Sequence, residues 1–286
     1  MTPRLVRRLR RRDDGFPALL SAIHDPPPGL FIRGCGEEDV LARPAVAVVG
    51  ARSCSSYGRS VARSLSRELA AAGLVVVSGM ARGIDGEAHR GALEAGGTTV
   101  AVLGCGIDRD YPAAHAELAR RICERGLIIS EYEPGIEPAP WRFPARNRII
   151  AGLCAATVVV EARERSGALI TADFALEEGR DVLAVPGEIT SSLSAGTNAL
   201  LRLGAIPVTG SGDVLELFDL VPAEPIRADL GATAQALLTL LGDGPLTADE
   251  IARATGVEPA PLSASLIELE LAGRVTLEDG VYRAAI

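Results

Sequence analysis

The sequence predicts an α/β protein in which a parallel sheet carries helices on both faces and a small C-terminal winged-helix domain follows. The first observation is that short apolar runs alternate with amphipathic stretches between residues 46 and 208. Unbroken β-branched runs are typical of strands buried on both faces, and strands that alternate with helices indicate a parallel sheet. The second observation is a change of pattern after residue 219, where three short helical stretches precede a ribbon.

The expected elements follow one another regularly along the chain. Strands are expected at residues 46–50, 74–78, 99–103, 126–130, 156–161, 182–185 and 205–208. Helices are expected between them at residues 57–72, 84–95, 113–124, 145–153, 169–178 and 196–203. Helices at 232–241, 247–254 and 259–272 and a ribbon over 274–283 make up the winged helix, with a core built from Leu262, Leu266, Ile267 and Leu269.

These patterns divide the chain into four parts. They are a basic segment with an extended connector (1–43), a sheet domain (44–219), a linker (220–230) and the winged helix (231–286). We interpret the basic segment as a solvated helix end, with an arm that contacts nucleic acid as the alternative; its basic residues are Arg4, Arg7, Arg8, Arg10, Arg11 and Arg12. The connector contains consecutive prolines at 26–28 and is expected to be extended.

The composition favours a cytoplasmic protein without a metal or cofactor. No apolar run approaches the ~20 residues that a membrane span needs, and the basic start lacks the apolar core of a signal peptide. The 5 cysteines lack C-x-x-C spacing, and neither they nor the 3 histidines show metal-ligand spacing. The net charge of −8 argues only weakly against nucleic acid, because the distribution of charge matters more than its sum.

Small or glycine-rich loops follow five of the expected strands. They are Gly50-Ala51-Arg52-Ser53, Ser78-Gly79-Met80-Ala81-Arg82-Gly83, Gly104-Cys105-Gly106, Ser166-Gly167 and Gly196-Thr197-Asn198. Because parallel strands end at one edge of a sheet, the loops predict a floor of N–H groups and hydroxyls suited to a polyanion or large nucleotide. The helix after the first loop is expected to offer free N–H groups to a phosphate. A G-x-G-x-x-G fingerprint and a lysine-bearing P-loop are absent, which argues against an NAD enzyme or P-loop ATPase.

Arginines and aromatics accompany these loops. Arg52 and Arg82 lie within them, and a run over residues 141–148 places Trp141 and Phe143 among further arginines. Positive charge interleaved with stacking surfaces favours single-stranded nucleic acid, whereas the alternative is that both aromatics pack into the core. The candidate DNA-binding residues are Arg52, Ser53, Ser78, Gly79, Arg82, Gly83, Arg142, Phe143, Arg146, Asn147, Arg148, Ser166, Gly167, Gly196, Thr197 and Asn198.

The candidates for catalysis are three polar residues at one expected helix start. Asp85 and His89 are four residues apart at a helix start, with Glu87 between them, so the first two could pair. No nucleophile or metal cluster accompanies them, and Asp85 is as easily a cap while His89 is satisfied on the sheet. We therefore expect no catalytic residues.

Several motifs resemble the DNA processing protein A (DprA/Smf) family, over about residues 16–218. They lie at 46–52, 78–89 (Ser-Gly-Met-Ala-Arg-Gly-Ile-Asp-Gly-Glu-Ala-His), 101–111, 143–152, 160–171 and 184–187. The resemblance implies an extended Rossmann-like fold that binds single-stranded DNA without enzymatic turnover. It also implies protection of incoming DNA in natural transformation, transfer to a RecA-type recombinase, and a homodimer. The family's groove would correspond to Arg52, Arg82, Phe143, Arg146 and Arg148. Many members carry a helical domain ahead of this region, where here only the basic stretch stands.

Two rival functions stay open from the sequence. One is an enzyme on nucleoside phosphates, because 184–187 and 195–197 are superficially similar to a Pro-Gly-Gly-x-Gly-Thr loop, although a paired catalytic Glu is not evident. The other is a duplex-DNA regulator that uses the winged helix. That domain is acidic, and its expected reading helix carries Glu268 and Glu270 but no Arg, so a protein-contact module is the favoured interpretation.

Overall fold

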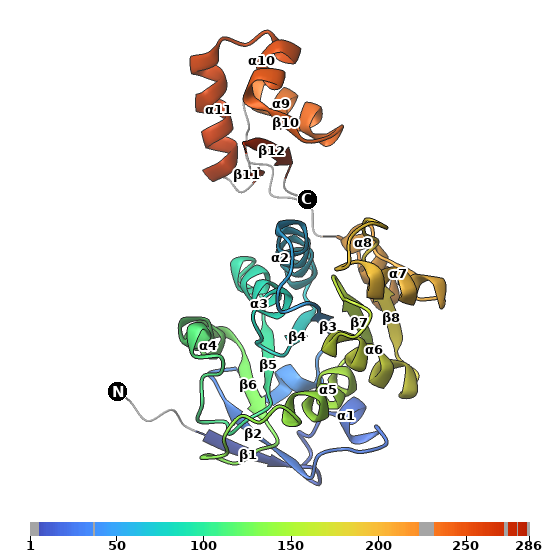
Figure 1. Cartoon of the computed structure of the whole chain (residues 1–286). Helices are drawn as coiled ribbons and strands as arrows, with labels where there is room; N and C mark the ends of the chain where they lie inside the picture. The colour runs from blue at the N-terminus through green and yellow to red at the C-terminus, as the bar shows by residue number, and fades with distance from the viewer. Residues whose placement is uncertain (1–5, 37, 223–231, 272–273, 279, 285–286) are drawn as a thin grey trace. The chain divides into compact units, whose positions relative to one another are not determined.

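The computed structural model describes residues 6–36, 38–222, 232–271, 274–278 and 280–284. The chain forms two compact units, Met1–Ala223 and Glu224–Ile286, which divide within the expected linker (Figure 1). None of the helices in the described ranges is long and apolar enough to cross a membrane.

The first unit is built on a sheet of nine strands in the order β1-β2-β6-β5-β4-β3-β7-β8-β9. The strands from β3 onward pair in parallel, and β2 joins β6 in antiparallel fashion. This confirms the predicted α/β class. The strands are β1 (Val6–Arg10), β2 (Gly29–Arg33), β3 (Ala45–Val49), β4 (Val75–Ser78), β5 (Thr99–Leu103), β6 (Leu127–Ser130), β7 (Ala156–Val159), β8 (Asp181–Ala184) and β9 (Ile206–Pro207).

The N-terminal segment differs from expectation. The prediction of a solvated helix end is wrong, because β1 is an edge strand that pairs with β2, and Leu9 faces Leu30 across that pair. The stretch expected to be only an extended connector supplies β2 itself. Leu9 is buried while Arg8 and Arg10 on either side are exposed, so the strand has the alternation of an edge with one apolar face. Charged side chains on such an edge discourage pairing with other sheets.

Helices cover both faces of the sheet (Figure 1). Around Leu69 and Ile84, one face packs against α2 (Ser56–Ala71), α3 (Ile84–Glu94), α4 (Ala116–Arg125) and α8 (Ser211–Leu215). Around Ile149 and Leu200, the other packs against α1 (Ala18–Ser21), α5 (Arg142–Leu153), α6 (Gly167–Glu177) and α7 (Ala195–Arg202). Short 3-10 turns complete the unit at η1 (Glu38–Ala42), η2 (Ala113–His115) and η3 (Glu216–Phe218).

The start of α5 lies three residues earlier than expected. Pro144 falls in its first turn, where a missing N–H costs no intrahelical hydrogen bond, so the helix begins at Arg142. The side chain of Arg142 therefore belongs to the helix and not to a preceding loop.

The second unit is a small helical domain with a three-stranded sheet of order β10-β12-β11. Its elements are α9 (Ala232–Gly242), β10 (Leu246–Thr247), α10 (Ala248–Thr255), α11 (Pro259–Leu271), β11 (Val275–Glu278) and β12 (Val281–Ala284). Leu262, Leu266 and Leu269 share the buried face of α11, but Ile267 is 55% exposed, so its prediction as a core residue is wrong. One residue of an α-helix turns the side chain by about 100°, which carries Ile267 off the face of Leu266. The expected helix end at residue 272 lies outside the described residues.

The order of the strands determines where a ligand can bind. β3 lies between β4 and β7, and the helices that follow β3 and β7 cover opposite faces of the sheet. Connections that leave a parallel sheet in opposite directions open a crevice beyond the carboxyl ends of the strands. The loops after β3, β4 and β7 therefore border the place where a site is expected.

Candidate nucleic-acid interface

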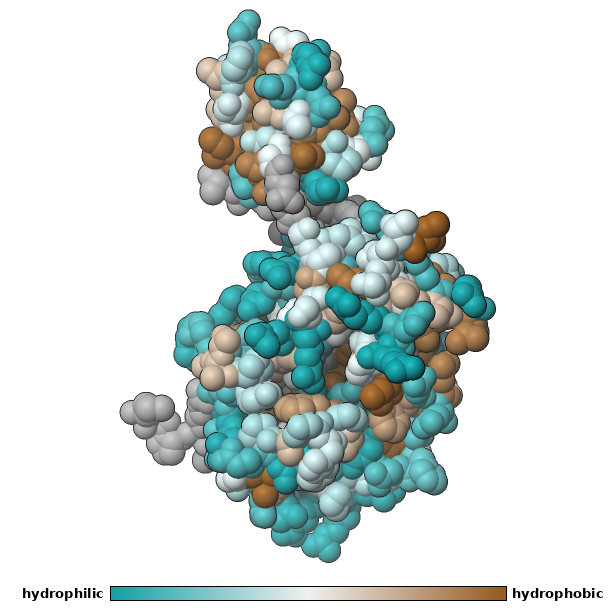
Figure 2. Space-filling model, in the orientation of Figure 1, coloured by the Kyte–Doolittle hydropathy of each residue, from teal (hydrophilic) through white to brown (hydrophobic). Residues whose placement is uncertain are grey.

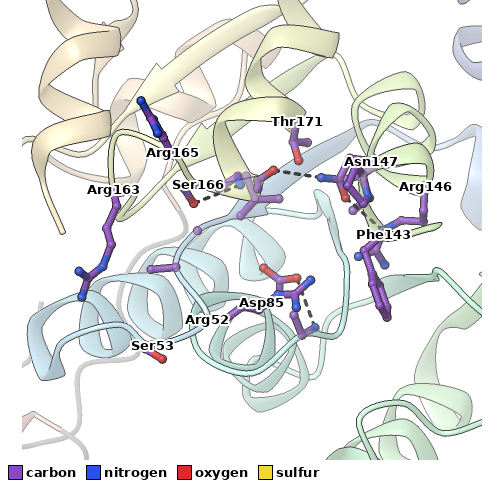
Figure 3. Close-up of a pocket in the computed structure, with 18 residues that line it drawn as sticks. Arg52, Ser53, Asp85, Phe143, Arg146, Asn147, Arg163, Arg165, Ser166 and Thr171 are labelled. Carbon is purple, nitrogen blue, oxygen red and sulfur yellow. Dashed lines mark hydrogen bonds between the residues drawn. The ribbon is translucent and has the colours of Figure 1, made fainter. Parts of the chain in front are cut away.

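A cavity of about 330 Å³ lies at the carboxyl ends of β3, β4 and β7. Its walls come from the loop after β3, the loop between β4 and α3, the loop after β7, and the first turns of α5 and α6 (Figure 3). Figure 2 shows this part of the surface hollowed, with hydrophilic side chains around it. Three loops and two helix starts that are distant in sequence thus converge on one opening.

Three exposed arginines surround the cavity: Arg52, Arg163 and Arg165. Within the described ranges, none of the three forms a hydrogen bond or an ion pair with a carboxylate. Arg163 and Arg165 extend from the loop after β7 in different directions (Figure 3). Their guanidinium groups keep their hydrogen-bond donors available for phosphate oxygens.

Phe143 supplies an aromatic wall. The Cζ atom of Arg52 lies 5.2 Å from the centre of its ring, and the ring of Tyr111 stacks on it with centroids 5.4 Å apart. Gly104 makes room for this ring, since a Cβ there would lie 2.9 Å from the Phe143 Cδ1 atom. Phe143 also lines a smaller hollow of about 160 Å³ together with Arg82. Phe143 is therefore partly accessible, and the alternative that it packs wholly into the core is wrong.

Trp141 is also not a core residue. Its side chain is 63% exposed, and the Cζ atom of Arg142 lies 4.7 Å from its ring centre and 5.3 Å from that of Tyr132. A cation held over aromatic rings leaves the outer faces of those rings free to stack. Arg142 does not line the cavity itself, so its predicted DNA contact would require a strand that runs beyond the opening.

The floor of the cavity contains a buried pair of charged side chains, Arg146 and Asp85. Arg146 is 3% exposed and donates from Nη1 to the carbonyl oxygens of Gly79, at 2.9 Å, and Val102. Burial lowers the pKa of Arg146 to about 10 and raises the pKa of Asp85. A Cβ on Gly79 would lie 2.6 Å from Arg146 Nη2 and 2.7 Å from Asp85 Oδ2, so this position requires glycine. Arg146 and Gly79 consequently build the floor and leave phosphate contacts to the exposed arginines.

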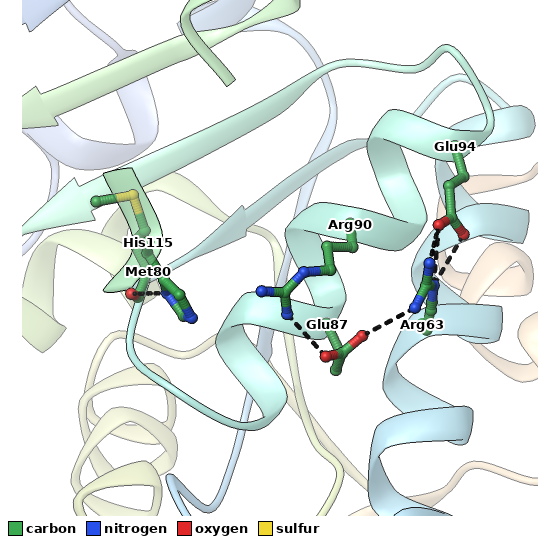
Figure 4. A network of polar contacts seen from close by, with 6 residues as sticks. All are labelled: Arg63, Met80, Glu87, Arg90, Glu94 and His115. Atoms are coloured by element: carbon green, nitrogen blue, oxygen red, sulfur yellow. Dashed lines mark hydrogen bonds and ion pairs between the residues drawn. The ribbon is translucent and has the colours of Figure 1, made fainter. Parts of the chain in front are cut away.

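Met80, which follows Gly79 in the floor of the cavity, has an uncommon backbone conformation. Its φ is 58°, and it is fully buried, which is costly for a residue with a Cβ. The Nδ1 atom of His115 lies 3.0 Å from the Met80 carbonyl oxygen and donates to it (Figure 4). The conformation turns the amide of Ala81 toward Asp85, whose Oδ2 accepts from it at 3.3 Å.

Arg148 is engaged away from the cavity. Its Nη1 and Nη2 atoms donate to the two carboxylate oxygens of Glu131 at 2.9 and 2.8 Å, and its Nε donates to Asp25 at 2.9 Å. Two residues along an α-helix rotate a side chain by about 200°, so Arg148 points away from Arg146. This geometry assigns Arg148 to holding α5 against its neighbours, contrary to its expected place in the groove.

Several other predicted contact residues hold the loops in place from within. Ser78 is fully buried and donates to the Val48 carbonyl oxygen at 2.7 Å, and Thr197 donates to Ser194 at 3.1 Å. Asn198 exchanges two hydrogen bonds with the backbone of Gly187. The side chains of these three residues are therefore occupied in the protein.

Of the remaining predicted residues, some line the cavity and others pack behind its wall. Ser53, Asn147, Ser166 and Gly167 line the cavity, and Asn147 also donates to the Gly167 carbonyl oxygen at 3.0 Å. Gly83 has a φ of 76° and a Cβ there would lie 2.3 Å from the Ala51 carbonyl oxygen.

Gly196 packs in the same way against the loop after β7, where its N–H donates to the Ala162 carbonyl oxygen at 2.7 Å. The cavity wall thus depends on close approaches of backbone as well as on side chains.

The N-terminus of α2 is not free to bind a phosphate, contrary to expectation. The buried carboxylate of Glu161 accepts hydrogen bonds from the Ser55 N–H, at 2.9 Å, and from its hydroxyl. Ser55 in turn accepts from the Gly58 N–H at 3.0 Å. A side-chain carboxylate already neutralises the positive end of this helix, which the sequence did not reveal because Glu161 lies 106 residues away.

The residues considered for catalysis do not converge. Glu87 pairs with Arg90 at 2.7 Å and with Arg63 at 3.6 Å (Figure 4). The Nδ1 atom of His89 lies 2.7 Å from the Thr99 hydroxyl, and burial lowers the pKa of His89 to about 3. His89 therefore does not pair with Asp85. In the part of the chain that the structure describes, no group of His, Cys, Asp and Glu side chains could hold a metal ion.

The fold and site define an α/β protein with an arginine-lined cavity at the carboxyl edge of its sheet. Comparison with protein families shows that the chain belongs to the DNA recombination-mediator protein A family, whose model matches residues 7–219. The DprA winged helix domain matches residues 221–280. The predicted family is thereby confirmed, and the chain is a member of a family of DNA-processing proteins.

Named relatives agree with this assignment. The chain is 44% identical over 263 residues to a putative DNA processing protein DprA of Mycobacterium tuberculosis, covering 89% of this chain and 68% of the relative. The solved DprA of Streptococcus pneumoniae is 48% identical with a TM-score of 0.71, and the match covers 73% of each chain. The DprA of Helicobacter pylori, described with its single-stranded DNA binding mode, is 30% identical with a TM-score of 0.69, covering 77% of this chain and 99% of that one.

Proposed function

We propose that this protein binds single-stranded DNA at the carboxyl edge of its sheet and acts without catalytic turnover. The observation that carries the proposal is a set of exposed arginines that have no carboxylate partner among the described residues and lie at the cavity that Phe143 also lines: Arg52, Arg163 and Arg165. Guanidinium groups neutralise phosphates, and an aromatic ring stacks on a base that has left its duplex. A duplex keeps its bases stacked inside, so it cannot use Phe143 in this way. The separate engagements of Glu87 and His89 favour binding over an enzymatic role.

Family membership supports a wider role in DNA uptake. We assign to the protein the protection of incoming single strands in natural transformation and their delivery to a RecA-type recombinase in the cytoplasm. Delivery requires a surface for a protein as well as one for DNA. We assign the DNA surface to the sheet unit, which contains the cavity, and the protein surface to the second compact unit.

A homodimer is part of the proposal. Leu176 and Leu203 are 56% and 84% exposed, and with Ile206 they border a hollow of about 190 Å³ beside the edge strand β9. Exposed leucines beside the edge strand of a sheet are typical of a protein–protein contact. A second copy that covers this surface would leave the carboxyl edge open to DNA.

The winged helix is proposed as a protein-contact module. On the outer side of α11 Ile267 is 55% exposed, and Glu268 and Glu270 are exposed near it. A duplex reader normally presents basic or amide side chains there, and these residues are acidic and apolar instead.

Fluorescence anisotropy with labelled 20-nucleotide single strands and matching duplexes tests the proposed DNA binding. The intact protein should prefer the single strand at every salt concentration. Arg52→Ala should weaken that binding for all sequences, while Arg120→Ala, which removes the same charge from exposed ion pairs on α4, should not. Equal affinity for both probes, or an Arg52→Ala variant that binds like the parent, would contradict the proposal.

A further inference from the structure

Tyr57 is an exposed aromatic residue four positions along the chain from Ser53, which lines the cavity. It lies in the first turn of α2 and is 49% exposed. Its hydroxyl donates to the Pro186 carbonyl oxygen at 3.4 Å, so the side chain bridges α2 and the loop between β8 and α7. Most large side chains of this unit are buried against the sheet, and the position of Tyr57 leaves part of its ring open to a ligand.

Three loops meet around this residue. The loop before α2 carries Arg52 and Ser53, which line the cavity, and the loop after β7 carries Arg163. That second loop is joined to the one after β8, because the Ala162 N–H donates to the Leu193 carbonyl oxygen at 2.8 Å. Figure 3 shows Ser53 and Arg163 on the same side of the opening. A strand that leaves the cavity on this side therefore reaches the first turn of α2.

The charges nearby distinguish which part of a nucleotide fits there. The carboxylate of Glu161 occupies the N-terminus of α2, so a phosphate gains nothing at that position and meets a like charge. The exposed Arg163 extends toward this end of α2 (Figure 3), whereas Arg59 lies against the Cys54 thiol, about 200° around the helix from Tyr57. A phosphate is therefore attracted to Arg163, and the uncharged face of a base fits beside Tyr57.

We infer that Tyr57 is a second base-stacking platform, which holds a nucleotide of the single strand after it leaves the cavity. The inference rests on the proposed function, since it assigns the path of the same ligand. It adds an aromatic contact that neither the glycine-rich loops nor the 141–148 run contains. Aromatic platforms spaced along a basic path are the usual means by which proteins hold single strands without reading sequence.

The test compares labelled oligothymidylates of 4 and 20 nucleotides by anisotropy across a salt series. Tyr57→Ala should weaken binding of the 20-mer between about 5- and 150-fold, the range for one lost base–aromatic stack. The slope of log affinity against log salt should stay unchanged, because no charge is removed. The 4-mer, which fills only the cavity, should bind as it does to the parent.

Two further variants separate stacking from structure. Tyr57→Phe keeps the ring and should bind the 20-mer like the parent, whereas Tyr57→Leu keeps apolar volume without a ring and should bind it like Tyr57→Ala. Parental affinity of Tyr57→Leu, or an equal loss for both probes with Tyr57→Ala, would overturn the inference. Parental affinity of both Tyr57→Ala and Arg52→Ala would overturn the proposed function itself, whereas loss with Arg52→Ala alone overturns only the role of Tyr57.

Discussion

Arg163 and Arg165 are expected to contribute to the salt dependence of single-strand binding. Both are exposed, and neither has a carboxylate partner among the described residues. Replacing both with alanine should remove two phosphate contacts. Each contact contributes about −0.7 to the slope of log affinity against log salt for single strands, so the double variant should flatten the slope by about 1.4. The ratio of the parent's affinity to the variant's affinity should therefore fall about sevenfold between 50 and 200 mM salt.

The assay is a salt titration of a labelled 20-nucleotide single strand against the parent, the Arg163→Ala/Arg165→Ala variant and Arg120→Ala. Arg120 is exposed and lies between Glu117 and Glu124 on α4, so its removal controls for net charge alone. A parental slope in the double variant, or an equal change with Arg120→Ala, would show that these arginines do not contact the phosphates.

Four other predictions test separate parts of the structure. Gly79→Ala should reduce unfolding free energy by about 1–3 kcal/mol in urea denaturation because its Cβ meets Arg146 and Asp85, whereas Gly212→Ala, with open space, should not. The folded-state pKa of His89, about 3, lies below its ordinary value, so the unfolded state takes up a proton first as pH falls. Stability should therefore drop by about 2–3 kcal/mol between pH 6 and pH 4, and His89→Gln should lose this part of the pH dependence. Phe143→Ala should weaken single-strand binding by about 1–3 kcal/mol, the range for one lost base–aromatic stack. A melting curve of the same variant gives the folded fraction. Parental affinity per folded molecule would show that Phe143 has a purely structural role. A protein that ends at Pro222 should retain most single-strand affinity, and loss of most binding would refute the protein-contact interpretation of the winged helix.

The sheet and its edge could be predicted from the sequence because the information is local. The strands from β3 to β8 are short, continuous apolar runs, and the loops that follow them lie at one edge once the strands are parallel. This reasoning places Arg52 at the edge of the sheet, whereas Phe143 is indicated by the arginines and aromatics that alternate over residues 141–148. β1 escaped the same reasoning because arginines interrupt its pattern and only Leu9 is buried.

The roles of individual side chains depended on partners distant in the chain. Arg146 and Arg148 are close in sequence, yet the first lies beneath the cavity and the second pairs with Glu131 and Asp25. A sequence does not reveal which carboxylate a given arginine will meet.

Two arginines that line the cavity are absent from the residues predicted to contact DNA. Arg163 and Arg165 stand directly before the predicted Ser166-Gly167 loop, and their position after a strand was a signal that could have identified them.

Single-stranded DNA is proposed to lie across the carboxyl edge of the sheet, against the cavity that Phe143 lines. Ultraviolet cross-linking of a thymidine 20-mer to the intact protein, followed by peptide mass spectrometry, tests this most directly. The principal adducts should fall in the peptides that contain Phe143 and the loop after β3. Adducts confined to the winged helix or to the opposite edge of the sheet would contradict the claim.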